Sequence, residues 1–256
     1  MIRIVKIGGN VIDDEQTLCH FLGLFVQLPS PKVLVHGGGK LATRLCEQLS
    51  IKTQMIDGRR VTDKETLDVV TMVYAGLVNK HIVALLQARG QQAIGLSGAD
   101  ANLIPAHRRS PIPVDYGFVG DIAADEVNAD FLRSLIQQGI TPVICPLTHD
   151  GEGSMLNSNA DGVASAVAIA ASRFDETQLV YCFEKQGVLR DVDNDNSVIP
   201  TIDAASFEQL RDEGVISKGM LPKITSSMKA IKSGVGSVVI KHADNLLNAI
   251  GITIIG

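Results

Sequence analysis

The chain has 256 residues, which is enough for one large domain or for two lobes that share a core. Its net charge is -5 and it has no dense run of lysine or arginine, so we expect neither nucleic acid nor an anionic membrane as a partner. Its four scattered cysteines and the absence of a signal-peptide pattern predict a reduced, cytoplasmic protein. The six histidines lack zinc-type spacing, so we predict no metal held by side chains.

Short apolar runs rich in β-branched residues alternate along the chain with helical patterns. This alternation predicts an α/β fold with a parallel sheet and helices on both of its faces. Several runs are almost wholly apolar, as expected of strands that are buried on both faces. The predicted strands are Ile2–Ile7, Lys32–His36, Ala93–Leu96, Thr141–Cys145, Gln178–Phe183, Ser237–Lys241 and Ile252–Ile255.

The segments between these strands carry helical periodicity. The longest of them begins with Thr62-Asp-Lys-Glu65, which predicts a capping box, and it ends at Gly90. The predicted helices are Leu41–Leu49, Asp63–Arg89, Ala129–Gln138, Ala160–Ala171, Ala204–Asp212, Pro222–Lys232 and Asn245–Ala249.

Two segments have no helical or strand pattern. Ala106–Glu126 is rich in proline and glycine, and it is compatible with either a hairpin or a mobile lid. The polar stretch Ser172–Thr177 is the predicted boundary between an N-terminal lobe, residues 1–172, and a C-terminal lobe, residues 173–256.

Glycine turns follow the first two predicted strands. Lys6-Ile-Gly-Gly-Asn10 ends the first strand, and His36-Gly-Gly-Gly39 follows the second and opens a helix. Ligands of open α/β sheets bind at the carboxyl ends of strands, and glycine N–H groups at a helix start suit an anion. A plain tight turn remains possible in both places. Gly37–Ala42 together with Asp57 also fits a dinucleotide-binding fingerprint, so an NAD(P)-dependent oxidoreductase remains an alternative.

Three further segments carry candidate ligand-binding groups. Gly58-Arg-Arg-Val-Thr62 contains two arginines, which suit a carboxylate ligand or a solvated surface. In Asn157-Ser-Asn-Ala-Asp161, Asn159 is suited to cap a helix and Asp161 to complement its dipole, unless these groups orient a ligand. Lys223 falls in the first turn of a predicted helix, where a bound anion would offset its repulsion from the dipole.

The order of these segments along the chain is distinctive. They are Lys6-Ile-Gly-Gly9, His36-Gly-Gly-Gly39, Gly58-Arg-Arg-Val-Thr-Asp63, Gly95-Leu-Ser-Gly-Ala-Asp100, Gly117-Phe-Val-Gly-Asp121, Asn157-Ser-Asn-Ala-Asp161 and Gly219-Met-Leu-Pro-Lys223. In this order they resemble the amino-acid kinase family over nearly the whole chain. The segments at Gly58 and Gly117 favour the branch acting on acylated glutamate over carbamate, uridylate, aspartate or free-glutamate kinases.

The resemblance implies a three-layer αβα sandwich around a mostly parallel sheet that two lobes share. The N-terminal lobe would bind an N-acylglutamate and form a homodimer, and the C-terminal lobe would hold ATP, with Mg2+ carried by the nucleotide phosphates. The implied reaction phosphorylates the side-chain carboxylate of N-acetyl-L-glutamate, giving N-acetylglutamyl phosphate and ADP for arginine biosynthesis.

The resemblance also implies roles for individual residues. Lys6 and Lys223 would stabilise the transferring phosphoryl group, and Asp161 would align both lysines. Arg60 would bind the α-carboxylate of the substrate. The other substrate-binding residues would be Gly37, Gly38, Asn157 and Asn159, and the nucleotide-binding residues would be Gly8, Gly9, Glu184, Gly187, Leu189 and Ser217.

The sequence departs from the family pattern in three places. Phe183-Glu-Lys185 replaces the usual Thr-Asp-Val, which leaves a non-catalytic sensor with a kinase fold as an alternative. Ser158 stands where an aliphatic residue is usual. Lys40 replaces a proline beside the substrate-side glycines, and Arg108 and Arg109 lie in the possible lid. A cation beside the acyl group would favour an acyl chain that ends in a carboxylate, so N-succinyl-L-glutamate is an alternative substrate.

Overall fold

The computed structural model describes residues 1–183, 199–215 and 221–255. Its central sheet has eight strands in the order β12-β14-β13-β11-β1-β2-β8-β5, and every neighbouring pair except β13 and β14 is parallel. The predicted α/β fold with a mostly parallel sheet is therefore confirmed. The strands are β1 (Ile2–Ile7), β2 (Lys32–His36), β5 (Ala93–Leu96), β8 (Thr141–Ile144), β11 (Thr177–Phe183), β12 (Thr201–Ile202), β13 (Ser237–His242) and β14 (Ile252–Ile254).

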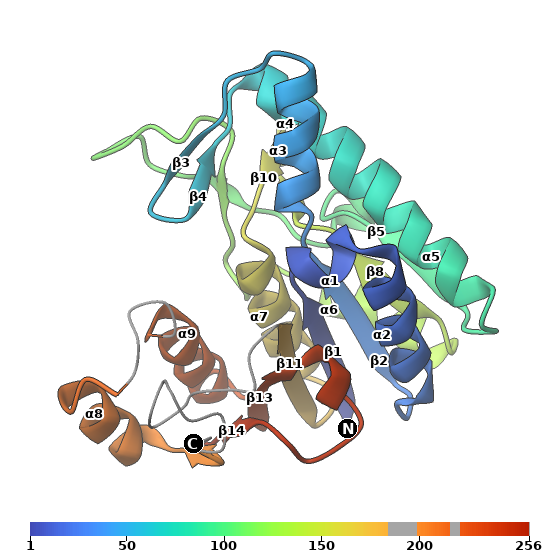
Figure 1. The fold of residues 1–256 in the computed structure, drawn as a ribbon, viewed down its shortest axis with the longest axis vertical. Helices are drawn as coiled ribbons and strands as arrows, with labels where there is room; N and C mark the ends of the chain where they lie inside the picture. Colours follow the sequence, from blue (N-terminus) through green and yellow to red (C-terminus); the bar gives the residue numbers. More distant parts are fainter. Residues whose placement is uncertain (184–198, 216–220, 256) are drawn as a thin grey trace.

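Helices cover both faces of this sheet and complete a three-layer αβα sandwich (Figure 1). One buried core joins the sheet to α2, α3, α4 and α5, and the other joins it to α6, α7, α8 and α9. The helices are α1 (Gly9–Asp13), α2 (Glu15–Gln27), α3 (Gly39–Gln48), α4 (Lys64–Thr71), η1 (Met72–Val78), α5 (Asn79–Gln87), α6 (Ala129–Gln137), α7 (Ala160–Ala171), α8 (Ala204–Asp212) and α9 (Leu221–Lys232).

The alternation of side chains along β1 directs its lysine toward one particular helix. Successive residues of a strand point to opposite faces of the sheet. Ile4 belongs to the core on the α7 side, and Val5 belongs to the core on the α2 side. Lys6 therefore points to the same face as Ile4, against which α7 packs.

Short antiparallel hairpins form separate two-stranded sheets outside the central sheet. β3 (Gln54–Ile56) pairs with β4 (Arg59–Val61), and β9 (Leu147–His149) pairs with β10 (Met155–Asn157). Within the irregular segment 106–126, β6 (His107–Arg108) pairs with β7 (Gly120–Asp121), so this segment contains a hairpin.

The structure corrects several predicted helices. α2 was not predicted, although Asp14 caps it by accepting from the backbone of Thr17 and its buried face has helical spacing. The helix that follows Thr62 is capped by Asp63, which accepts from Thr66 N at 2.8 Å, so the predicted capping box is wrong. No α-helix covers 245–249, since only the short 3-10 turn η3 (Ala243–Asn245) forms there.

The middle of the long helix is a π-helix rather than an α-helix. In η1, Val73 and Val78 are both buried although they are five positions apart, a spacing that suits the wider turn of a π-helix. α4, η1 and α5 together form one helical segment, 64–87, that is long and apolar enough to span a membrane by composition. Its buried residues, Leu67, Val70 and Ile82 among them, belong to the core beside the sheet, as in a helix of a globular domain.

Candidate active site

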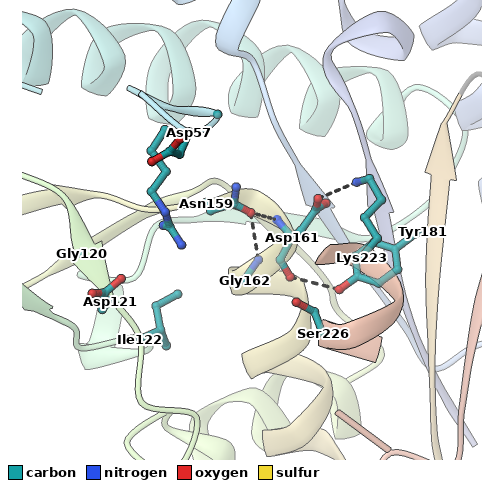
Figure 2. Close-up of a pocket in the computed structure, with 12 residues that line it drawn as sticks. Asp57, Gly120, Asp121, Ile122, Asn159, Asp161, Gly162, Tyr181, Lys223 and Ser226 are labelled. Atoms are coloured by element: carbon teal, nitrogen blue, oxygen red, sulfur yellow. Dashed lines mark hydrogen bonds and ion pairs between the residues drawn. The ribbon is translucent and has the colours of Figure 1, made fainter. Parts of the chain in front are cut away.

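Two adjoining pockets lie at the carboxyl ends of the central strands. The first, of about 380 Å3, contains Asp161 and Lys223, and we call it the lysine pocket (Figure 2). The second, of about 190 Å3, contains Gly37 and Gly38, and we call it the glycine-loop pocket. Because Arg59 lines both pockets, they form neighbouring parts of one site.

The two predicted catalytic lysines meet on one carboxylate. Asp161 forms an ion pair with Lys6 Nζ through Oδ1 and accepts a hydrogen bond from Lys223 Nζ through Oδ2, each at 2.7 Å. Lys6 comes from β1, Asp161 from the first turn of α7 and Lys223 from the first turn of α9. Three segments distant in the sequence thus hold two ammonium groups on one carboxylate.

The lysines keep Asp161 ionised in this partly buried position. Burial alone would raise the pKa of the Asp161 carboxyl, but the charges and hydrogen bonds of Lys6 and Lys223 outweigh it and hold the pKa at about 2. The carboxylate is therefore a permanent anion at neutral pH. It can fix the positions of both ammonium groups while leaving their remaining N–H bonds available to a ligand.

The two predicted asparagines serve different structural purposes. Asn159 is the N-cap of α7, and its side chain accepts from Asp161 N at 2.8 Å and Gly162 N at 3.2 Å. Asn157 is buried at the end of β10 and donates to Thr62 Oγ1 at 3.0 Å. Both asparagines line the glycine-loop pocket.

Arg60 is buried in the glycine-loop pocket with one side of its guanidinium free. Its Nη2 donates to Gly39 O at 3.0 Å and to Thr43 Oγ1 at 2.8 Å. Its Nε and Nη1 are buried and have no hydrogen-bond partner. A buried charged donor without a partner is costly, and a guanidinium N–H bonds strongly to an anionic acceptor. These two donors of Arg60 are therefore suited to bind an anionic group of a ligand.

The glycine loop closes the other side of this pocket. Gly38 has a φ of 152°, and a Cβ there would lie 3.0 Å from Cδ1 of the Tyr74 ring. Glycine is therefore required by both the backbone angle and the close approach of Tyr74. The other predicted glycines, Gly8 and Gly9, lie beside Gly39 in an adjacent pocket of about 370 Å3.

The other cations predicted near the substrate have partners of their own. Lys40 does not line the glycine-loop pocket; its Nζ bonds to Asn10 Oδ1 and lies 3.7 Å from Asp13 Oδ2. Arg108 donates to Gly117 O at 2.8 Å, and Arg109 forms an ion pair with Asp121. None of these three residues lines the glycine-loop pocket, and each is held by a protein partner.

Ser158 is accounted for by the polar groups around it. Its hydroxyl lies 2.9 Å from Thr148 Oγ1 and donates to Gly120 O at 3.0 Å. The buried hydroxyl is therefore satisfied where the family usually has an aliphatic side chain.

The nucleotide side of the site is described only in part. Four of the predicted nucleotide-binding residues, Glu184, Gly187, Leu189 and Ser217, lie outside the described residues. The ring of Phe183, the last described residue of β11, has its centroid 5.6 Å from Lys223 Nζ.

The dinucleotide-binding alternative is not supported by the position of its acidic residue. Asp57 and Gly58 have φ values of 48° and 74° and form the turn of the β3–β4 hairpin. Asp57 thus lies in a turn rather than at the end of the strand beside β2, where a ribose-binding carboxylate is expected.

Several contributors to the site were missed by sequence reasoning. Arg59 was considered together with Arg60 for a carboxylate ligand or a solvated surface but was assigned no role of its own, and Tyr74 and Thr62 were given no role at the pockets. Asn79, which contacts His36 behind the glycine loop, was not singled out either. Only Arg59 had a usable signal, its place in the Gly58–Thr62 segment; the other three are identified by contacts between distant segments.

Among the residues that the structure describes, no three His, Cys, Asp or Glu side chains come together as a metal site would require.

The chain was compared with known proteins. Residues 1–242 match the model of the amino acid kinase family. The chain is 54% identical to the acetylglutamate kinase of Phocaeicola vulgatus, covering 99% of this chain and 98% of that protein. It is 37% identical to the acetylglutamate kinase of Methanopyrus kandleri, covering 98% of both chains.

Solved structures agree with this result. The structure of smu.665 from Streptococcus mutans has a TM-score of 0.78 and 29% identity, covering 99% of this chain and 98% of that one. Carbamate kinase from Giardia lamblia, at 13% identity and a TM-score of 0.67 over 99% of this chain and 98% of that one, shows the same fold. The sequence match over residues 1–242 and the position of the two lysines on Asp161 lead to one conclusion: the chain belongs to the amino acid kinase family.

Proposed function

We infer that the protein is an ATP-dependent kinase that phosphorylates the side-chain carboxylate of N-acetyl-L-glutamate, releasing N-acetylglutamyl phosphate and ADP, in arginine biosynthesis. The observation that carries this inference is the pair of ammonium groups held on Asp161 beside a buried arginine with a free edge. The relatives named acetylglutamate kinase extend over essentially the whole chain and support it.

The charges of the site suit the transfer of a phosphoryl group from one anion, the triphosphate, to another, the carboxylate of the substrate. A glutamate side chain is already ionised at neutral pH, so the attacking carboxylate needs no general base. The difficulty is the repulsion between this carboxylate and a triphosphate. Lys6 and Lys223 reduce that repulsion and stabilise charge on the phosphoryl group, and Asp161 keeps both ammonium groups in place before the substrates arrive.

The glycine-loop pocket would hold the acylated amino acid. The free Nε and Nη1 of Arg60 are suited to its α-carboxylate, and Asn157 and the backbone of Gly37 and Gly38 line the same cavity. The side-chain carboxylate would then extend toward the neighbouring lysine pocket. Lys6, Asp161 and Lys223 are all present and paired with one another, which favours a catalyst over a non-catalytic sensor.

ATP would bind to the C-terminal lobe, residues 173–256, and the acylated amino acid would bind to the N-terminal lobe, residues 1–172. The sheet supports this division, since β11, β13, β14 and β12 follow β1 on one side and β2, β8 and β5 follow it on the other. Mg2+ would be carried by the phosphates of the nucleotide and would neutralise part of their charge.

We also propose that the protein works in the cytoplasm as a homodimer. η1 exposes two large apolar side chains, Met72 at 54% and Leu77 at 61%, on the helix opposite the sheet-facing residues. An exposed apolar helix face of this kind is suited to pack against the same face of a second copy.

A coupled assay of ADP release with Mg-ATP tests the reaction. N-acetyl-L-glutamate should stimulate ADP release, and hydroxylamine should trap the acyl phosphate as a hydroxamate. Free L-glutamate is the matched control and should give far less product. ADP release that does not depend on the acylated amino acid would contradict the proposal.

A further inference from the structure

Two consecutive arginines of β4, Arg59 and Arg60, line the glycine-loop pocket, but only one of them is held by the protein. Arg60 is buried and donates to Gly39 and Thr43. Arg59 is half-buried, and its side chain makes no hydrogen bond or ion pair with any residue in the described part of the chain. Among the described residues, Arg59 is therefore a basic side chain of the site that no protein group binds.

Arg59 differs from the other basic side chains of the two pockets, which have partners in the protein. Among the described residues that line the two pockets, Lys223 is paired with Asp161, and Arg60 has partners on one edge. Of the other acidic residues of these linings, Asp121 is paired with Arg109, which lies outside both linings, and Asp57, in the turn just before Arg59, has no ion pair among the described residues. Arg59 is thus the basic side chain of the two linings that has neither an ion pair nor a hydrogen bond.

The two carboxylates of the proposed substrate already provide ligands for the other cations of the site. Its side-chain carboxylate must meet the phosphoryl group near Lys6 and Lys223, and its α-carboxylate has the free edge of Arg60. The remaining part of the substrate is the acyl group. An acetyl group ends in a methyl, which offers nothing to a guanidinium, whereas an acyl chain that ends in a carboxylate offers two acceptor oxygens in the geometry that arginine prefers.

We propose that Arg59 is a specificity-determining residue that lets the site take N-acyl-L-glutamates whose acyl chain ends in a carboxylate. The proposal rests on the proposed function and extends its range of substrates. It assigns to Arg59 the role for which Lys40, Arg108 and Arg109 are unsuited, since each of those residues is bound elsewhere.

The shape of the site is compatible with a longer acyl chain. The glycine-loop pocket has about 190 Å3, and it continues past Gly58, Arg59 and Asn159 into the lysine pocket of about 380 Å3. An acyl chain longer than acetyl therefore has open space to enter. The turn at Asp57 and Gly58 holds the start of β4 at the edge of this space, on the opposite side of the pocket from Lys223 (Figure 2).

Arg59 also lies close enough to the lysine pocket that contact with the phosphoryl group is a competing role. The two roles predict different kinetics. A contact with the phosphoryl group would lower kcat for every acyl substrate, whereas a contact with the acyl carboxylate affects only substrates that carry one.

The test compares kcat/KM for N-acetyl- and N-succinyl-L-glutamate in the full-length enzyme and in Arg59→Leu, Arg59→Lys and Lys40→Leu. The wild type should use N-succinyl-L-glutamate at least as well as the acetyl substrate. Arg59→Leu should lower kcat/KM for N-succinyl-L-glutamate much more than for the acetyl substrate, so that the succinyl-to-acetyl ratio falls about ten- to a hundredfold. Arg59→Lys should restore part of the ratio. Lys40→Leu is the matched control and should leave the ratio unchanged.

Binding without chemistry gives a second readout. In the absence of ATP, N-succinyl-L-glutamate should raise the Tm of the wild type more than that of Arg59→Leu, at a concentration where N-acetyl-L-glutamate raises both equally. A succinyl-to-acetyl ratio that is the same in the wild type and Arg59→Leu would overturn the proposal. An equal loss for both substrates would overturn it too and assign Arg59 to the phosphoryl group. Activity on neither substrate in the wild type would refute the proposed function itself.

Discussion

The side-chain amide of Asn79 donates to Nε2 of His36 at 3.1 Å, although the two residues are 43 positions apart. Nε2 is therefore the unprotonated nitrogen, and Nδ1 donates to Gly37 O at 2.7 Å. Through this pair, the start of α5 supports the glycine loop from behind. The arrangement requires a neutral imidazole.

This relationship predicts how stability depends on pH. Burial lowers the pKa of His36 to about 4, opposed by its hydrogen bond to Gly37, whereas in the unfolded chain its pKa is the ordinary histidine value of 6.5. The folded pKa is below the unfolded one, so the contribution of His36 is complete above pH 6.5. It should fall by about 3 kcal/mol as the pH drops to about 4, because one pH unit between the two pKa values is worth about 1.4 kcal/mol. Urea unfolding measured from pH 7.5 to 4 should show this loss of unfolding free energy in the wild type and a smaller loss per pH unit in His36→Gln. An equal dependence on pH in the two proteins would contradict the prediction.

Replacing either lysine of the site should damage catalysis more than binding. Lys6→Met and Lys223→Met each remove one charge that matters chiefly when the phosphoryl group is in transfer. We expect kcat to fall about 10²- to 10³-fold and KM to rise less than tenfold. Steady-state kinetics on folded variants measure this, with circular dichroism as the check of folding. A variant with nearly unchanged kcat would remove its lysine from the mechanism.

Asp161→Asn should be milder than either lysine variant. The asparagine keeps one oxygen acceptor but loses the charge that both ammonium groups share at 2.7 Å. If Asp161 acts only by positioning the lysines, kcat should fall by about tenfold while both lysines still contribute. A kcat below those of Lys6→Met and Lys223→Met would instead indicate direct contact of Asp161 with the nucleotide or its metal.

Arg60→Lys should weaken the binding of the acylated amino acid. A lysine retains the charge but not the separate Nε and Nη1 donors that Arg60 leaves without a partner. We expect KM for N-acetyl-L-glutamate to rise about ten- to a hundredfold, with a smaller effect on KM for ATP. Arg44→Lys is a suitable control, since Arg44 lies 3.8 Å from Asp13 and outside both pocket linings. Equal changes in the two KM values would show that Arg60 supports the fold rather than the substrate.

Leu77→Glu should separate the proposed homodimer into monomers. A carboxylate on the exposed apolar face of η1 would be buried without a partner when two copies meet. Analytical ultracentrifugation at micromolar concentration should show a monomer for this variant and a dimer for the wild type. Leu247→Glu changes another exposed leucine, outside this helix, and should remain dimeric. A Leu77→Glu protein that stays dimeric would place the interface elsewhere.

The sequence by itself determined the central strands, several helices and the family. β1, β2, β5 and α7 have the predicted bounds, because an apolar run between turn residues or a capped helical period is a local property of the chain. The resemblance carried by the glycine and lysine motifs also implied that Lys6, Asp161 and Lys223 belong to one site, and the structure brings the three side chains together.

The tertiary structure decided which cations face the substrate. Lys40 stands beside the glycines in the sequence, yet its side chain bonds to Asn10 on α1, whereas Arg59 reaches both pockets from a hairpin. The π-helix that places Tyr74 against Gly38 was likewise absent from the local pattern. Side-chain direction depends on how separate elements pack and on which partner lies within reach, and adjacency in the sequence does not specify either of these.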